Sequence, residues 1–98
     1  MRTVFYLICR LRTATGFEAF GNFNLGNNRS FAYTLFEHLK GRREATPADV
    51  LQLDLMETSN GLPINLRVIS CTAEELAANC KYITKEMFKL LSLENNTL

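Results

Sequence analysis

The stretch LQLDLMETSNGLPINLRVI, residues 51–69, decides the fold. Its apolar residues alternate with other residues on both sides of the turn sequence TSNG at 58–61. Alternation with a period of two is typical of a strand, and two such runs around a glycine-containing turn predict a β-hairpin. Pro63 has no backbone N–H to donate, so the second strand is expected to begin there or to lie at a sheet edge.

A helix is expected directly after this hairpin. Thr72-Ala73-Glu74-Glu75 has the pattern of a capping box, in which a hydroxyl and a carboxylate each accept a backbone N–H at the start of a helix. The apolar residues that follow recur at three-to-four spacing to about Leu93, which predicts a helix with one apolar stripe.

The first part of the chain repeats this order. In residues 3–11 and 17–25 one set of apolar residues occupies every second position, and the turn sequence TATG at 13–16 lies between the two runs. This pattern predicts a second hairpin. Asn28 or Ser30 can cap a helix that follows it, with apolar positions from Phe31 to Leu39.

The two repeats predict an α+β fold of the order ββαββα. We expect a four-stranded, mainly antiparallel sheet with two helices packed on one face. The 98 residues suffice for one core, so 1–98 is expected to be a single domain. Its two ββα units span about 3–41 and 50–93 and are joined by the loop 42–49. Their equal size suggests a possible internal duplication.

The charge of the chain is balanced overall but uneven along its length. The net charge is +1, and the 47% hydrophobic content excludes a disordered chain. Residues 1–43 carry +5, however, whereas residues 44–98 carry −4. If the two units form opposite ends of the domain, two copies are expected to pair antiparallel, with an association that salt weakens.

The N-terminal apolar run and the cysteines indicate a cytoplasmic protein. The run from Val4 to Cys9 is too short for a signal-peptide core, and no stretch is long enough to cross a bilayer. We therefore expect no membrane association. Cys9, Cys71 and Cys80 form no paired motif and are expected to be free thiols.

The sheet face opposite the predicted helices is the main candidate site. Alternation places a mixture of large apolar and basic side chains there, which is unusual for a face in contact with water. We expect an interface with a second copy or another protein, formed by Tyr6, Ile8, Arg10, Arg12, Phe20, Met56, Arg67 and Ile69. The helices are expected to cover the other face, at Phe5, Leu7, Phe17, Phe23, Leu53, Ile64 and Leu66. The simpler alternative is an ordinary face that the helices or the tail cover further.

The same residues allow a second interpretation, a weak single-stranded nucleic-acid-binding module. Tyr6 and Phe20 could stack on bases while Arg10, Arg12 and Arg67 pair with phosphates. The acidic second part and a sequence pI near 7.7 argue against this interpretation.

Two smaller candidates lie at the starts of the predicted helices. Asn28, Arg29 and Ser30 could hold an anion, although a strand end followed by a capped helix explains these residues better. Cys71 precedes the cap Thr72, so the helix N-terminus could lower the pKa of its thiol.

The sequence otherwise lacks a convergent catalytic or ligating set. His38 is the only histidine, and nothing in the sequence places it near the Cys71 thiol. We therefore expect no enzyme, no cofactor and no metal site. Arg42 and Arg43 follow the first predicted helix, where we expect solvated cations that favour the helix dipole.

Overall fold

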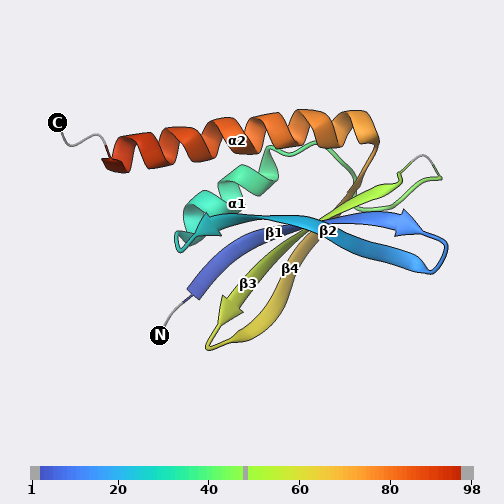
Figure 1. Cartoon of the computed structure of the whole chain (residues 1–98), viewed down its shortest axis with the longest axis horizontal. Helices are drawn as coiled ribbons and strands as arrows, with labels where there is room; N and C mark the ends of the chain where they lie inside the picture. Colours follow the sequence, from blue (N-terminus) through green and yellow to red (C-terminus); the bar gives the residue numbers. More distant parts are fainter. Residues whose placement is uncertain (1–2, 48, 96–98) are drawn as a thin grey trace.

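The computed structural model, which describes residues 3–47 and 49–95, has the expected α+β fold with the order ββαββα (Figure 1). The elements are β1 (Thr3–Thr13), β2 (Gly16–Gly26), α1 (Arg29–Glu37), β3 (Leu51–Ser59), β4 (Leu62–Cys71) and α2 (Ala73–Asn95). None of the helices in the described part of the chain is both long and apolar enough to cross a bilayer.

The four strands form one antiparallel sheet in the order β2-β1-β3-β4. The first strands of the two units, β1 and β3, lie at its centre and pair from Thr3↔Ser59 to Leu11↔Leu51. The second strands form the edges, so Pro63 lies on an edge strand as the sequence predicts.

Both helices pack on the same face of the sheet (Figure 1). The core lies between this face and the helices. Leu7, Leu53 and Leu55 from the central strands are fully buried there, together with Leu35 of α1 and Ile83 of α2. The core is shared by the two units, because its buried strand residues come from both.

Side chains define the two helix starts. Asn28 Oδ1 accepts the backbone N–H of Phe31 at 3.0 Å and caps α1. At α2, Thr72 Oγ1 accepts the N–H of Glu75 at 3.2 Å, and Glu75 Oε1 accepts the N–H of Thr72 at 3.0 Å. The predicted capping box is therefore confirmed.

The β3–β4 turn also has the geometry that its sequence predicts. Asn60 and Gly61 both have positive φ, 55° and 81°. Two such residues form the tight turn whose twist matches a hairpin, and asparagine followed by glycine is its preferred sequence.

Each edge strand contains a β-bulge that the sequence does not reveal. The register of β2 shifts twice, opposite Phe5/Tyr6 and opposite Cys9/Arg10, and that of β4 shifts once, opposite Leu55/Met56. One extra residue in a strand moves all the residues beyond it to the other face. The predicted alternation is therefore wrong for part of each edge strand.

Three side chains consequently lie on the face opposite to the one predicted. Phe17 pairs with Arg12 and lies on the face without helices. Ile69 pairs with Leu53 and packs against the core under the helices. Arg67 faces the same way, with its guanidinium carbon 5.0 Å from the ring centroid of Tyr33 in α1.

One bulge in each edge strand fits an approximate two-fold symmetry of the two units, whereas the second shift in β2, opposite Phe5/Tyr6, has no counterpart in β4. The register shift between residues 9 and 10 of β1 and the shift between residues 55 and 56 of β3 are 46 residues apart along the chain. An axis through the sheet near the Ile8↔Asp54 pair exchanges β1 with β3 and β2 with β4. The structure thus agrees with the suggested internal duplication.

The buried leucines of β3 provide a test of this core. Leu53→Ala is expected to lower the free energy of unfolding by about 2–5 kcal/mol, because it leaves a cavity at a fully buried position. Leu62→Ala in the same hairpin is the control, since Leu62 is 68% exposed and its truncation is expected to cost less than about 0.5 kcal/mol. Urea unfolding monitored by circular dichroism measures both, and equal losses would contradict the described packing.

Candidate functional site

The sheet face without helices carries a contiguous group of apolar side chains. Val4, Tyr6, Ile8, Met56 and Val68, here called the apolar row, lie on β1, β3 and β4. Cross-strand pairing brings them together, because Tyr6 is opposite Met56, while Ile8 and Val68 flank Asp54. Met56 is buried and the other four are half-buried, so their neighbours in the sheet already cover part of their surface.

A polar network continues the face beside the apolar row. Asp54 is only 4% exposed and accepts hydrogen bonds from Arg10 Nε at 2.9 Å, Gln52 Nε2 at 3.1 Å and Asn65 Nδ2 at 3.3 Å. We call these four residues the Asp54 network. Its carboxylate is thus paired and hydrogen-bonded, as a charge under a protein contact needs to be.

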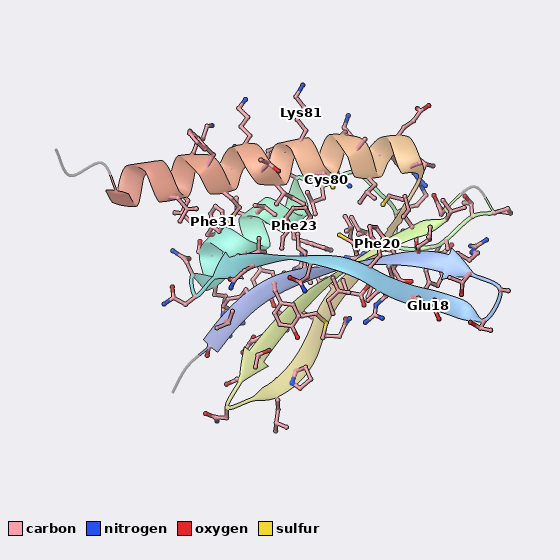
Figure 2. All side chains as sticks on the ribbon, viewed as in Figure 1. Glu18, Phe20, Phe23, Phe31, Cys80 and Lys81 are labelled. Carbon is pink, nitrogen blue, oxygen red and sulfur yellow. The ribbon has the colours of Figure 1, made fainter. Side chains whose placement is uncertain are left out.

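The predicted interface residues are brought together only in part. Tyr6, Ile8, Arg10 and Met56 share the uncovered face. Arg12 lies on the same face, with its guanidinium carbon 5.6 Å from the ring centroid of Phe17. Phe20, labelled in Figure 2, is the unpaired residue of β2 at the register shift opposite Cys9/Arg10, and it is 56% exposed. Arg67 and Ile69 are on the other side of the sheet, so the prediction was wrong for these two.

The groups of the nucleic-acid interpretation are separated in the same way. Arg67 is exposed on the side of the sheet that carries the helices, on the far side from Tyr6. Arg10 is engaged by Asp54. The stacking platform with three free cations that the sequence suggested is therefore not assembled on one face.

The candidate anion site at the start of α1 has internal partners. The Asn28 side chain caps the helix. Arg29 Nη2 is 3.2 Å from Glu57 Oε1, and its guanidinium carbon is 5.2 Å from the ring centroid of Phe5. Ser30 is exposed. The cation that was expected to pair with an anion is thus paired with a carboxylate of β3.

Arg42 is the centre of an ion cluster, which contradicts the expectation of a solvated cation. Its guanidinium donates hydrogen bonds to the carboxylates of Asp49 and Glu75. Its backbone pairs with Ser70 of β4, with N···O distances of 2.9 and 2.7 Å. Arg42 therefore ties the loop after α1 to both β4 and α2.

The two carboxylates of this cluster are held in their charged form. Hydrogen bonds from Thr46, first from its backbone N–H, lower the pKa of Asp49, and Arg42 adds to this effect. The Arg42 hydrogen bond is the main reason why the pKa of Glu75 is lowered, followed by the Thr72 N–H. The same contacts raise the pKa of Arg42.

The ion pairs also account for the uneven charge along the sequence. Arg10, Arg29 and Arg42 come from the basic first part, and their partners Asp54, Glu57, Asp49 and Glu75 all come from the acidic second part. These opposite charges therefore meet within one chain. These ion pairs reduce the separation into a basic and an acidic end on which the expected antiparallel pairing rests.

Cys71 does not have the properties expected of a nucleophile. It is fully buried, and desolvation raises the pKa of its thiol to about 11. The prediction that the helix N-terminus lowers this pKa was wrong, because burial is the larger effect. His38 Nδ1 lies 2.8 Å from the carbonyl oxygen of Thr34, and its ring stacks on Tyr82 with a centroid distance of 5.9 Å.

The described residues contain no cluster of three or more His, Cys, Asp or Glu side chains that could hold a metal ion. Comparison with protein-family models, with curated proteins and with solved structures gave no match. A function for this chain therefore has to be argued from the geometry of its own surfaces.

Thiol alkylation tests the placement of the cysteines. With iodoacetamide at about pH 7.5, Cys80 is expected to react first because it is partly exposed. Cys9 and Cys71 are expected to react only after unfolding, since both are buried and their pKa values are raised to about 11. Peptide mass spectrometry measures the order, and preferential labelling of Cys71 in the folded protein would contradict it.

The Arg42 cluster predicts a specific pH dependence of stability. A carboxyl with a lowered pKa stabilises the fold above its ordinary value, here 3.8 for Asp49 and 4.5 for Glu75, and this contribution is lost as the pH falls through the lower folded value. Arg42→Met is expected to reduce stability at pH 7 and to make its decline below about pH 4.5 shallower.

Urea midpoints between pH 7 and pH 3 measure this effect. The matched control is Arg43→Met at the adjacent exposed position, which is expected to leave the pH profile unchanged. Parallel profiles for the wild type and the Arg42→Met variant would contradict the assigned role of the cluster.

Proposed function

We propose that this chain is a non-enzymatic, self-associating interaction module of the cytoplasm, whose uncovered sheet face packs against the same face of a second copy. The observation that carries the proposal is the apolar row on the sheet face opposite both helices. An antiparallel sheet with helices on one face normally presents polar side chains on the other. Three free cysteines fit a reducing compartment.

The dimensions of the face suit a homodimer contact. Strands of about ten residues extend roughly 34 Å, and four strands span roughly 19 Å. The flat area of this face is therefore on the order of 600 Å², without the additional surface of the protruding side chains. A standard interface buries about 800 Å² of accessible surface on each partner, so the whole of this face, including its protruding side chains, would be needed.

The apolar row supplies the driving force in this proposal. It crosses the centre of the sheet, where residues of a two-fold interface meet their own equivalents. Removing apolar area from water contributes about 25 cal/mol per Å², and association costs have to be subtracted from this gain. Because the side chains are already half-buried among their neighbours, they would lose little conformational freedom in the contact.

The Asp54 network would supply specificity. Its carboxylate has three hydrogen-bond donors in the free chain, so covering it leaves no unpaired charge. Buried ion pairs contribute little net affinity, but they penalise partners that place another charge against them. We therefore assign affinity to the apolar row and orientation to the Asp54 network.

Self-association of the purified protein tests this proposal. The wild type is expected to dimerise at concentrations of about 1–100 μM, and Tyr6→Glu is expected to weaken the dimer at least about tenfold, because a charge would be buried in the apolar row. Sedimentation velocity measures the association, and circular dichroism with thermal unfolding confirms that the variant is folded.

The control variant is Ile64→Glu, which introduces the same charge at a 47% exposed residue opposite Glu57, on the other face of the sheet. It is expected to dimerise like the wild type. Because three arginines of the first part are paired within the chain, 0.5 M salt is expected to leave the association unchanged or to strengthen it. A strictly monomeric wild type at 100 μM would overturn the proposal.

A further inference from the structure

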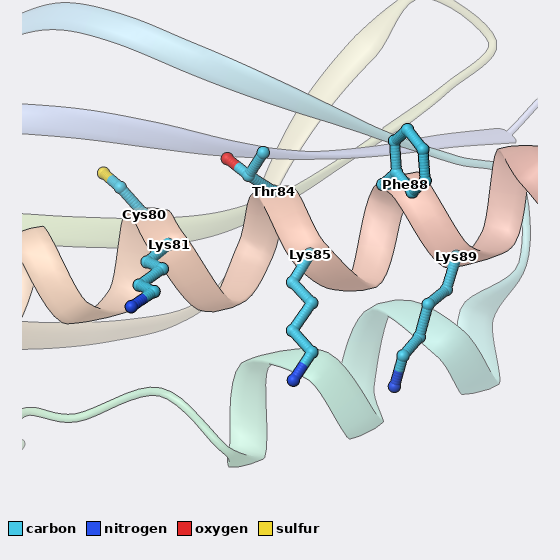
Figure 3. A pocket seen from close by; sticks show the side chains of 6 residues that line it. All are labelled: Cys80, Lys81, Thr84, Lys85, Phe88 and Lys89. Carbon is cyan, nitrogen blue, oxygen red and sulfur yellow. The ribbon is translucent and has the colours of Figure 1, made fainter.

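The outward side of α2 carries a furrow that the fold itself does not use. It is lined by Cys80, Lys81, Thr84, Lys85, Phe88 and Lys89, and we call it the α2 furrow. Residues four apart on a helix lie one above the other, so these side chains form two parallel ridges. Figure 3 shows Lys81, Lys85 and Lys89 projecting to one side, and Cys80, Thr84 and Phe88 to the other.

Large apolar groups are exposed at one end of this furrow. Phe88 is 72% exposed and Leu91 is 50% exposed. The side of α2 that packs on the core is formed by other residues, among them Asn79, Ile83 and Met87. Phe88 therefore contributes almost nothing to the core, although a phenylalanine in water has an unfavourable hydration free energy.

The lysine ridge is largely uncompensated. Lys89 Nζ is 3.4 Å from Glu86 Oε2, whereas Lys81 and Lys85 have no ion pair within the described part of the chain. Like charges one helical turn apart repel each other and slightly destabilise a helix. Figure 2 shows Lys81 pointing away from the sheet. By contrast, Arg10, Arg29 and Arg42 all have acidic partners.

We infer that the α2 furrow binds an acidic amphipathic helix of a partner protein. The ridge of one helix packs into the groove between two ridges of another, and the α2 furrow is a shallow groove of this kind on a single helix. Apolar residues of the partner would cover Phe88 and the lysine stems. Carboxylates along one edge of the partner helix would pair with Lys81, Lys85 and Lys89.

A second copy of this chain is a poorer occupant of the furrow. In an antiparallel two-fold pair of helices each flank meets the same flank of the other copy, so two lysine ridges would face each other. Two acids of α2 are also engaged already, Glu75 by Arg42 and Glu86 by Lys89. The inference thus concerns a different surface and a different partner from the proposed homodimer.

A designed peptide provides the test. The probe is a fluorescein-labelled helix of three heptads, with leucine at the two seam positions of each heptad and glutamate at the flanking positions. Fluorescence anisotropy is expected to show saturable binding of this peptide to the wild type. A matched peptide with lysine in place of glutamate is expected to bind at least about tenfold more weakly.

Variants of the furrow locate the binding. Lys85→Glu and Phe88→Ala are each expected to weaken binding of the acidic peptide about tenfold, since both residues line the furrow. Arg43→Glu is the matched control, because it reverses the charge of an exposed residue outside α2. Its binding constant is expected to stay within about twofold of the wild type. Circular dichroism verifies that each variant is folded.

Three results would overturn the inference. The first is the absence of binding of the acidic peptide to the wild type. The second is an equal loss in the Arg43→Glu variant, which would indicate general charge attraction. The third is a protein that does not bind the peptide but binds vesicles containing phosphatidylserine, with this vesicle binding lost in the Lys85→Glu variant. The furrow would then be a membrane contact.

Discussion

The pairing of β1 with β3 is the interaction on which the rest of the structure depends. These strands are the first strands of the two units, and their nine paired positions bring Leu7 against Leu55 and Cys9 against Leu53. Only when they pair does a continuous apolar surface exist for both helices to cover. The same pairing creates the opposite face, where Tyr6 meets Met56 and Ile8 meets Asp54. The core and the candidate interface are therefore the two faces of the same pair of strands. A shift of one strand by one residue against the other would turn its core residues to the uncovered face.

The ion pairs strengthen the same junction between the two parts of the chain. Arg10 pairs with Asp54 and Arg29 pairs with Glu57, while Arg42 pairs with both Asp49 and Glu75. The Arg10–Asp54, Arg29–Glu57 and Arg42–Glu75 contacts join residues that are far apart in sequence, whereas Arg42–Asp49 lies within the loop between α1 and β3. Arg42 and Asn79 reinforce this end of the molecule, since Asn79 hydrogen-bonds both backbone groups of Lys40 at 2.7 and 2.8 Å. The uneven distribution of charge along the sequence is thus a property of how one chain folds.

Local patterns in the sequence were enough to predict the order and type of the elements. Alternation around TSNG and TATG, the Asn28 cap and the Thr72 capping box all concern residues within a few positions of each other. The bulges were not predictable, because an extra residue in β2 or β4 is defined only by its partner strand. This is why Arg67 and Ile69 were assigned to the wrong face. The partners of Arg42 and the burial of Cys71 likewise depend on tertiary contacts.

The α2 furrow had a local signal, lysines at 81, 85 and 89 beside Phe88, but the sequence alone does not tell which side of a helix faces the core.

The two edges of the sheet differ in a way that limits assembly. At β4, Pro63 removes one backbone donor, and the Arg42 backbone occupies both hydrogen-bonding groups of Ser70. At β2, no further backbone segment pairs with the outer edge in the described part of the chain. An additional strand can pair with backbone groups that are left free at a sheet edge, and Pro63 and Arg42 remove some of these groups at β4, so β4 offers a shorter free edge than β2. Gly41 is what lets Arg42 approach β4 this closely, because a Cβ added to it would lie 2.8 Å from the carbonyl oxygen of Ser70.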